Sequence, residues 1–257
     1  MKALALLVAV AMPLSAQAAE TGDLVRFIAC PVYRDADSGK KSGCWLADDP
    51  QTGARWDVSL SPHKPDWNFA VLVEGRVSAG KPDVCGARVL DAVRTSRLYD
   101  QPCTQHMLPA EGYPGRRYKL NGRYIDPVSV PRQAPAGPFG PRTFPVYFEF
   151  GSDFLIYQYD DFLIDRAETW LKAAKPKRVV VTGYAMTTPA RVSGQTIAEP
   201  AALARARAEA VSETLRRLLP GLVIETRWRG GAEPTQDADA DGLPWQSQRR
   251  VEIAPEF

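Results

Sequence analysis

The spacing of apolar residues changes along the chain, and before residue 109 it is typical of β-strands. Within residues 20–108, apolar positions form short runs or alternate with polar ones, and turn residues separate these segments. The expected strands are 43–49, 54–60, 69–78 and 85–99, the last holding one or two strands. About five strands with a short helix or loop at 61–67 predict a small β-barrel of the OB type, although any small barrel would fit.

The pattern from residue 144 onward mixes two periods. Strand-like segments alternate with segments whose apolar residues recur every three or four positions, which is the spacing of an amphipathic helix. The expected strands are 144–150, 178–184, 222–228 and 249–255, and the expected helices are 159–174 and 198–221. Pro200 suits the first turn of the second helix. The order β-α-β-α-β-β predicts an α/β sandwich with both helices on one face, so the whole chain is expected to be of the α+β class.

Proline and glycine are concentrated between these two parts. Eight prolines occur from Pro109 to Pro145, and proline lacks a backbone donor and fixes φ. We therefore expect a semi-rigid linker at 109–143, which separates a first domain at 20–108 from a second domain at 144–257.

The first 19 residues predict export. Met1-Lys2 gives a positive start, residues 3–14 are apolar but too short to span a bilayer, and Ala16-Gln17-Ala18 has the pattern of a signal-peptidase site. Residues 1–19 are expected to be a removable signal peptide, with a short buried helix as the alternative. No later stretch approaches the ~20 apolar residues of a transmembrane helix. The expected location is the periplasm of a Gram-negative bacterium, with or without attachment to the outer membrane or cell wall.

Charge and motifs argue against nucleic acid, cofactors and catalysis. The formal net charge is +2 and the basic residues are dispersed, so the electrostatic signature of nucleic-acid binding is missing. The two histidines, His63 and His106, lie in the first part, and no GxSxG, HExxH or phosphate-binding glycine loop occurs. We expect a protein that is not an enzyme and that holds no cofactor and no metal.

Two further patterns have a structural and a functional interpretation. Residues 237–242 (DADADG) resemble the start of a calcium loop, but the twelfth position, which should be a bidentate glutamate, is Gln248, so a solvated loop is favoured. Trp45, Trp56 and Trp67 could stack on a ligand, but core positions are commoner for tryptophan in a small β-domain.

The four cysteines all lie in the first part of the chain. An even number of cysteines in an exported protein predicts two disulfides. Of three possible pairings we favour Cys30–Cys44 and Cys85–Cys103, because each closes a loop of fewer than ~20 residues. A zinc site is the alternative, but the CxxC spacing that is usual for zinc is missing.

Four segments of the second part occur in the order that is typical of one bacterial family. They are 146–155 (VYFEFGSDFL), 179–185 (VVVTGYA), 203–211 (LARARAEAV) and 248–253 (QRRVEI). By these segments, residues 144–257 resemble the OmpA-like, peptidoglycan-associated C-terminal domain. The resemblance implies a ligand, the diaminopimelate of a peptidoglycan stem peptide, and a ligand site that includes Ser152, Gly183 and Arg250. Residues 20–108 show no resemblance of comparable specificity.

In that family, an aspartate of a Gly-His-Thr-Asp loop takes the ammonium of the ligand and a helix arginine takes its carboxylate. Arg207 matches the arginine. The helical pattern supports this, because Leu203, Arg207, Val211 and Leu215 share one face, and a charge on an apolar stripe needs a partner or a polar groove. The alternative is that Arg207 extends to the surface or pairs with a structural acid.

The aspartate of this ligand site is missing. Met186 stands where the family has its aspartate, Pro200 stands where it has an asparagine, and extra residues occur around 191–199. Methionine is a weak acceptor, and the loss of one charge-assisted hydrogen bond costs about 1.5–3 kcal/mol, or roughly ten- to a hundredfold in affinity. Glu199 could restore the negative charge, or it could simply complement the helix dipole.

Two functions from different classes follow. The first is a periplasmic binding protein that associates with peptidoglycan, weakly because of Met186, and that engages other envelope proteins. The second is a structural subunit of an envelope-spanning assembly, such as a secretion or motility machine, that uses the fold for protein contacts. Arg207 favours the first function, whereas Met186 and Pro200 favour the second. On sequence alone we prefer the wall-associated function.

Overall fold

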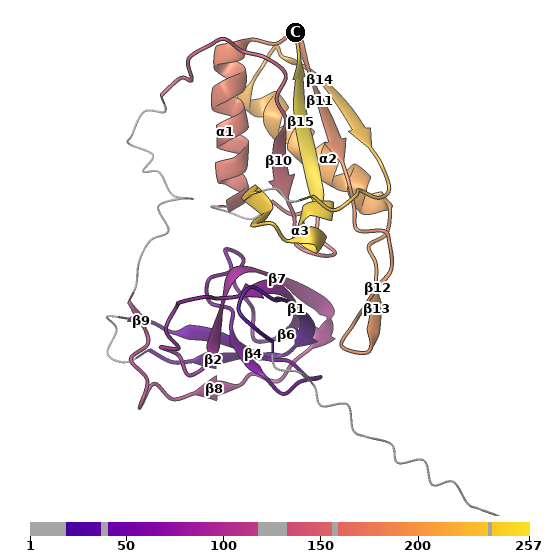
Figure 1. Cartoon of the computed structure of the whole chain (residues 1–257). Coiled ribbons are helices and arrows are strands. Elements are labelled where there is room, and N and C mark those ends of the chain that lie inside the picture. Colours follow the sequence, from indigo (N-terminus) through magenta and orange to yellow (C-terminus); the bar gives the residue numbers. More distant parts are fainter. Residues whose placement is uncertain (1–18, 37–40, 118–132, 156–158, 236–237) are drawn as a thin grey trace, which may run out of the picture.

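The computed structural model describes residues 19–36, 41–117, 133–155, 159–235 and 238–257 (Figure 1). Residues 1–18 of the predicted signal peptide and 118–132 of the predicted linker lie outside the described residues. We call residues 19–117 the N-terminal half and residues 133–257 the C-terminal half.

The N-terminal half is built on a seven-stranded sheet of order β1-β6-β7-β5-β4-β2-β8. The strands are β1 (Leu24–Ala29), β2 (Pro31–Arg34), β4 (Cys44–Asp48), β5 (Arg55–Asp57), β6 (Phe69–Val77), β7 (Arg88–Pro102) and β8 (Met107–Leu108). Neighbouring strands are antiparallel, except that β5 pairs with β7 and β2 with β8 in parallel. Apolar residues on alternate positions of these strands, such as Val71 and Val73, fill a fully buried core.

The sheet bends at Cys30, the single residue between β1 and β2. On one side of the bend β1 pairs with β6, and on the other side β2 pairs with β4. The strand order of the described residues shows a mixed sheet and not a closed barrel, so the predicted OB-like barrel is not established by it. A further short pair, β3 (Lys41–Ser42) with β9 (Arg116–Arg117), attaches the start of the predicted linker to this half.

All four cysteines form disulfides, but the favoured pairing is wrong. The bonds join Cys30 to Cys103 and Cys44 to Cys85, across 73 and 41 residues of sequence. Strand pairing brings these distant segments together. The backbone N–H of Cys103 donates to the carbonyl of Asn68, directly before β6, and β6 pairs with β1, which ends directly before Cys30. Loop length in sequence was therefore a poor guide to distance in space.

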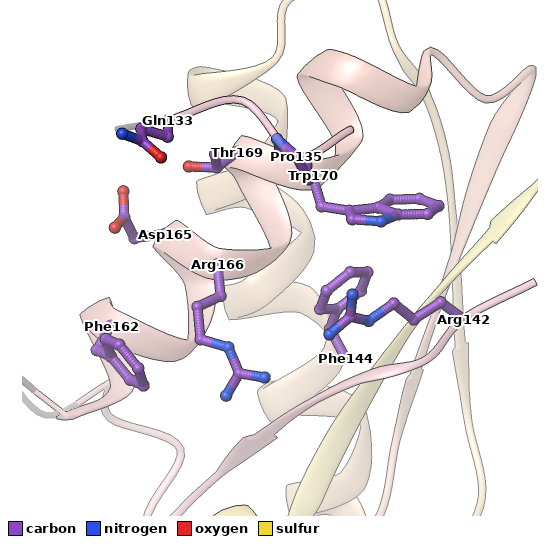
Figure 2. A pocket seen from close by; sticks show the side chains of 9 residues that line it. All are labelled: Gln133, Pro135, Arg142, Phe144, Phe162, Asp165, Arg166, Thr169 and Trp170. Carbon is purple, nitrogen blue, oxygen red and sulfur yellow. The ribbon is translucent and has the colours of Figure 1, made fainter. Parts of the chain in front are cut away.

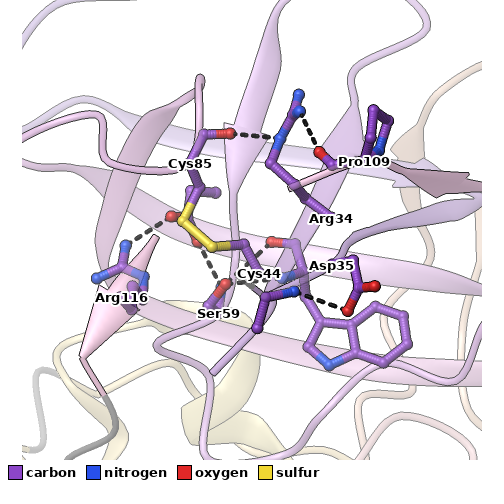
Figure 3. The surroundings of a disulfide bond; sticks show 10 residues. Arg34, Asp35, Cys44, Ser59, Cys85, Pro109 and Arg116 are labelled. Carbon is purple, nitrogen blue, oxygen red and sulfur yellow. Dashed lines mark hydrogen bonds and ion pairs between the residues drawn. A yellow bond between two sulfur atoms is a disulfide. The ribbon is translucent and has the colours of Figure 1, made fainter. Parts of the chain in front are cut away.

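The second disulfide is surrounded by polar groups of the chain (Figure 3). Cys44 and Cys85 are almost completely buried, and Arg34 donates to the carbonyl of Cys85 at 3.0 Å. The carboxylate of Asp57 lies close to both sulfur atoms and is paired with Arg116 at 2.6 Å. Because both sulfur atoms are in the disulfide, this group offers no thiolate to a metal ion.

The C-terminal half is a four-stranded sheet of order β10-β15-β11-β14 with two helices on one face. Its main elements are β10 (Phe144–Tyr147), α1 (Tyr159–Ala174), β11 (Arg178–Gly183), α2 (Ala202–Leu218), β14 (Val223–Trp228) and β15 (Arg250–Glu256). They follow the predicted order. Apolar side chains of both helices share one core with the sheet, as expected for amphipathic helices.

Two additions distinguish this half from the predicted plan. A hairpin, β12 (Ala190–Val192) with β13 (Gln195–Ile197), fills the segment of extra residues before α2. A short 3-10 turn η1 (Ala238–Ala240) and a short helix α3 (Pro244–Gln248) precede β15. Helix α2 also begins later than predicted, at Ala202, because Glu199 is held by the loop at Met186. Within the described residues, no helix combines the length and apolar character needed to cross a membrane.

Peptide mapping without reduction tests the disulfide pairing. We expect linked peptides for Cys30–Cys103 and Cys44–Cys85, and replacement of Cys44 and Cys85 by alanine should lower the free energy of unfolding by about 4 kcal/mol in the chain-entropy account. A linked peptide that contains Cys30 and Cys44 would contradict the structure.

Candidate functional site

Arg207 lies in the second turn of α2 and faces the sheet. Its neighbours on the same helix face, Ala204, Ala208, Val211 and Leu215, are completely buried, and so is Arg207 itself. The guanidinium reaches the end of β11, beside the loop that follows this strand (residues 184–189). The sequence therefore predicted the correct loop for this side chain, but the structure shows Arg207 as a completely buried group and not as an accessible ligand-binding residue.

Every donor of Arg207 is used inside the chain. A guanidinium side chain has five N–H donors. The Nε donates to the carbonyl of Ser152 at 2.8 Å, Nη1 to that of Tyr184 at 3.1 Å and Nη2 to that of Glu149 at 3.1 Å. The remaining two donors go to the carboxylate of Glu199, at 2.9 and 2.5 Å. No donor is left for a ligand.

Glu199 is satisfied in the same way. Its Oε1 accepts from Arg207 and from the backbone N–H of Gly151 at 2.8 Å, and its Oε2 accepts from Arg207 and from the backbone N–H of Met186 at 2.7 Å. A carboxylate has about four lone-pair sites, and each is occupied. Both side chains of the pair are completely buried.

The electrostatics favour the charged pair. Burial by itself would raise the pKa of Glu199, but the hydrogen bonds and charge of Arg207, with further help from Arg249 and the N–H of Met186, lower that pKa below its usual value. Glu199 is therefore ionised at neutral pH, and it supplies Arg207 with the kind of carboxylate that the family resemblance assigns to the ligand.

Met186, in the loop after β11, lies in an apolar cluster. Met186 is 1% exposed and packs with Ile197 of the hairpin and with Ile28, Leu72 and Leu98 of the N-terminal half. Methionine fits this role because its flexible thioether fills irregular gaps. The position that would hold an ammonium thus contributes to the interface between the two halves.

The other predicted site residues divide into two groups. Ser152 joins the Arg207 cluster through its carbonyl, whereas its hydroxyl accepts from the N–H of Phe154. Gly183 permits close helix packing, because a Cβ there would meet the carbonyl of Ala204 at 1.9 Å. Arg250 points elsewhere: it lies over the ring of Tyr184 at 4.8 Å and donates to the carbonyl of Ser247.

The N-terminal half covers this loop region (Figure 1). The backbone N–H of Ile28 donates to Ser193 at the hairpin tip, and the amides of Gln101 and Gln195 bond to each other. Ser96 accepts from the N–H of Phe150 at 2.9 Å. The added hairpin therefore serves as a contact between the halves.

Glu74 forms a second contact between the halves. This side chain of β6 is 2% exposed, pairs with Arg26 at 2.9 Å, and accepts from the backbone N–H groups of Trp245 and Gln246 at 2.9 Å each. The guanidinium of Arg26 also lies over the ring of Trp245. A buried carboxylate with three partners holds α3 against the N-terminal sheet.

A third contact centres on Glu149. This residue pairs with Arg97 at 3.3 Å, and its Oε1 lies 3.8 Å from Nδ1 of His63, whose side chain is completely buried. Burial raises the pKa of Glu149 against the opposing charges of Arg97 and Arg249. Sequence reasoning missed these residues, although an acid within the apolar run 146–150 was a visible signal.

The acids of the DADADG segment also take part in ion pairs. Asp239 pairs with Arg166 at 2.8 Å and Asp241 pairs with Arg94, while Asp237 lies outside the described residues. The two described carboxylates thus contact arginines, and Arg94 connects this segment to the N-terminal half.

The tryptophans of the N-terminal half differ in burial. Trp56 is a core residue at 2% exposure. Trp45 and Trp67 pack edge-to-face with Tyr33 and with each other, with ring centroids 5.0 to 5.8 Å apart. The three rings are used for packing among themselves.

A separate cavity of about 310 Å³ lies between α1 and residues 133–144 (Figure 2). Phe144 and Trp170 form part of its wall, and the guanidinium of Arg142 lies over the Phe144 ring at 4.8 Å. Asp165 and Arg166 of α1 also line it, so its charged side chains are of both signs.

Comparison with known proteins gives limited support. No protein-family model matches the chain, and no curated protein matches it. Among solved structures, it is similar to the OmpA-like domain of FopA1 from Francisella tularensis subsp. tularensis SCHU S4, with 24% identity over 44% of this chain and 71% of that chain and a TM-score of 0.33.

Replacement of Glu199 by alanine should destabilise the fold strongly. It leaves the buried charge of Arg207 without its partner, which costs about 3–5 kcal/mol of unfolding free energy. The matched control is Glu209→Ala on the same helix, where the pair with Arg205 is exposed and the expected loss is about 0–1 kcal/mol. Urea unfolding followed by tryptophan fluorescence measures both. Equal, small losses would show that Glu199 does not neutralise a buried charge.

His63 should make stability fall in acid. Burial, and then the positive charges of Arg94, Arg97 and other basic groups, lower the pKa of His63 well below 6.5. The pKa of His63 is lower in the folded state than in the unfolded state. The contribution of neutral His63 to the free energy of unfolding is therefore complete above the unfolded-state pKa, and it is lost as the pH falls below that value. The expected slope is about 1.4 kcal/mol per pH unit below pH 6.5.

Urea unfolding between pH 7.5 and 5 provides the check. The His63→Gln variant should lack this slope, whereas the exposed-histidine variant His106→Gln should keep it. An unchanged slope in His63→Gln would mean that another group causes the acid loss.

Proposed function

We propose that this chain is a non-enzymatic protein of the bacterial cell envelope that acts through contacts with proteins. In its OmpA-like domain, the ligand site at Arg207 is closed, because Glu199 of the same chain occupies it. The observation that carries the proposal is the pairing of Arg207 with Glu199, in which all five guanidinium donors are used within the chain. A stem-peptide carboxylate would have to displace the carboxylate of Glu199, which belongs to the same chain and therefore cannot diffuse away. Such a competitor has an effective concentration that a free ligand rarely matches.

The missing aspartate supports the same proposal. Met186 offers the ammonium of a diaminopimelate no carboxylate, and its side chain is 1% exposed beneath the N-terminal half. Neither half of the family's clasp is therefore available to a ligand, which favours the structural function over the wall-associated one that the sequence first suggested.

Two separate observations support the proposed location in the cell envelope. The predicted signal peptide and the two disulfides are both typical of exported proteins. We further infer that the N-terminal sheet is an OB-type module, since a bent first segment pairs with both sides of the sheet and β5 runs parallel to β7. OB barrels are often only partly closed.

Sedimentation with purified peptidoglycan tests the proposed function. The purified protein should remain in the supernatant to the same extent as an unrelated protein of similar size, with or without prior muramidase digestion, because Arg207 has no donor for a ligand. Pelleting that muramidase digestion abolishes would contradict the proposal and restore the wall-associated function.

A further inference from the structure

The end of the C-terminal half that faces away from the N-terminal half carries an apolar pocket of about 380 Å³. Helices α1 and α2 both end there, and β14 begins there, whereas the contacts with the N-terminal half lie at the other end of the sheet (Figure 1). Leu171, Leu219 and Leu222 line the pocket from three different segments. Leu218 borders it and is 39% exposed.

The rim of this pocket is positively charged. Lys172 and Lys175 line it, and Lys177, Arg216 and Arg217 follow within the adjoining segments. Lys172 is paired with Glu168. Among the described residues, the other four cations have no carboxylate partner in an ion pair: Arg216 and Arg217 bond to neutral oxygen atoms.

Helix dipoles do not account for this charge. The carbonyl ends of α1 and α2 contribute roughly −0.5 elementary charge each, or about −1 together, against four cations. Three acids lie at this end: Glu213 is exposed on the adjacent turn of α2, and Glu225 and Glu256 both pair with a fifth cation, Arg178. Five cations against three carboxylates and about one negative charge from the helix ends leave about one positive charge. A net positive field therefore surrounds an apolar recess, which is the complement of an aliphatic side chain flanked by carboxylates.

The neighbouring strand adds a backbone component. β14 is an edge strand that pairs with β11 on one side only, and its first residue, Val223, is 60% exposed directly after the pocket residue Leu222. An exposed edge presents unpaired N–H and C=O groups to an incoming strand. A partner strand along β14 would pass the mouth of the pocket.

From this geometry we propose that the pocket and the β14 edge form a docking surface for an extended peptide segment of a protein partner, with an aliphatic anchor residue in the pocket and acidic residues beside it. The recess favours a peptide over a membrane surface, because a single side chain fills a concave pocket and a bilayer surface does not. The proposal names the partner surface of the proposed function and rests on it, but it uses none of the residues at Arg207.

Selection from a phage-displayed library of random peptides, carried out on the purified disulfide-bonded protein, tests the proposal. The expected consensus is one aliphatic residue with neighbouring aspartate or glutamate. Synthetic peptides of that consensus should bind at least about tenfold more weakly to Leu218→Asp and to Lys175→Glu. The matched controls, Phe154→Asp and Arg191→Glu, change the charge by the same amounts at exposed positions outside this surface and should bind normally.

Three outcomes would overturn the proposal. In the first, no peptides are enriched. In the second, peptides are enriched but bind all four variants equally. In the third, no peptide binds, whereas anionic phospholipid vesicles bind and this binding is lost in Leu218→Asp. Thermal unfolding of each variant establishes that a loss of binding is not a loss of fold. None of these results bears on sedimentation with peptidoglycan, so the docking surface can be disproved independently of the proposed function.

Discussion

The desolvation of one guanidinium group is the constraint on which the C-terminal half depends. A buried charge without partners costs several kcal/mol, so Arg207 can be completely buried only if the chain supplies acceptors for every donor. Three carbonyl groups and the carboxylate of Glu199 meet this need. They come from the residues that follow β10, the residue that follows β11 and the residues before α2. The pair therefore fixes the paths of two loops as well as its own geometry.

This closure also determines how the two halves fit together. With Glu199 bound to the backbone of Met186, the methionine side chain turns toward the apolar cluster that the halves share. Around that cluster, buried carboxylates of Glu74 and Glu149 are matched by arginines from the opposite half or their own. The loop end of the C-terminal half is thus occupied by residues of its own chain and by the N-terminal half.

Much of this architecture could be predicted from the sequence, for physical reasons that also explain the errors. Helix α1 occupies the predicted 159–174 because its apolar spacing is strong. The hairpin before α2 was missed because three-residue strands carry almost no period. The disulfide pairing was wrong because strand order, and not sequence separation, brings Cys30 to Cys103. Arg207 and Glu199 were both identified, but their pairing depends on a loop path that no local pattern encodes.

The most direct measurement of the closed site is an NMR spectrum of the Arg207 guanidinium, assigned with an Arg207→Lys variant. We predict resolved Nε–H and Nη–H signals that exchange slowly with water and do not move when a diaminopimelate-containing stem peptide is added at millimolar concentration. Signals that exchange as fast as those of free arginine, or that shift in a saturable way with the peptide, would contradict the account.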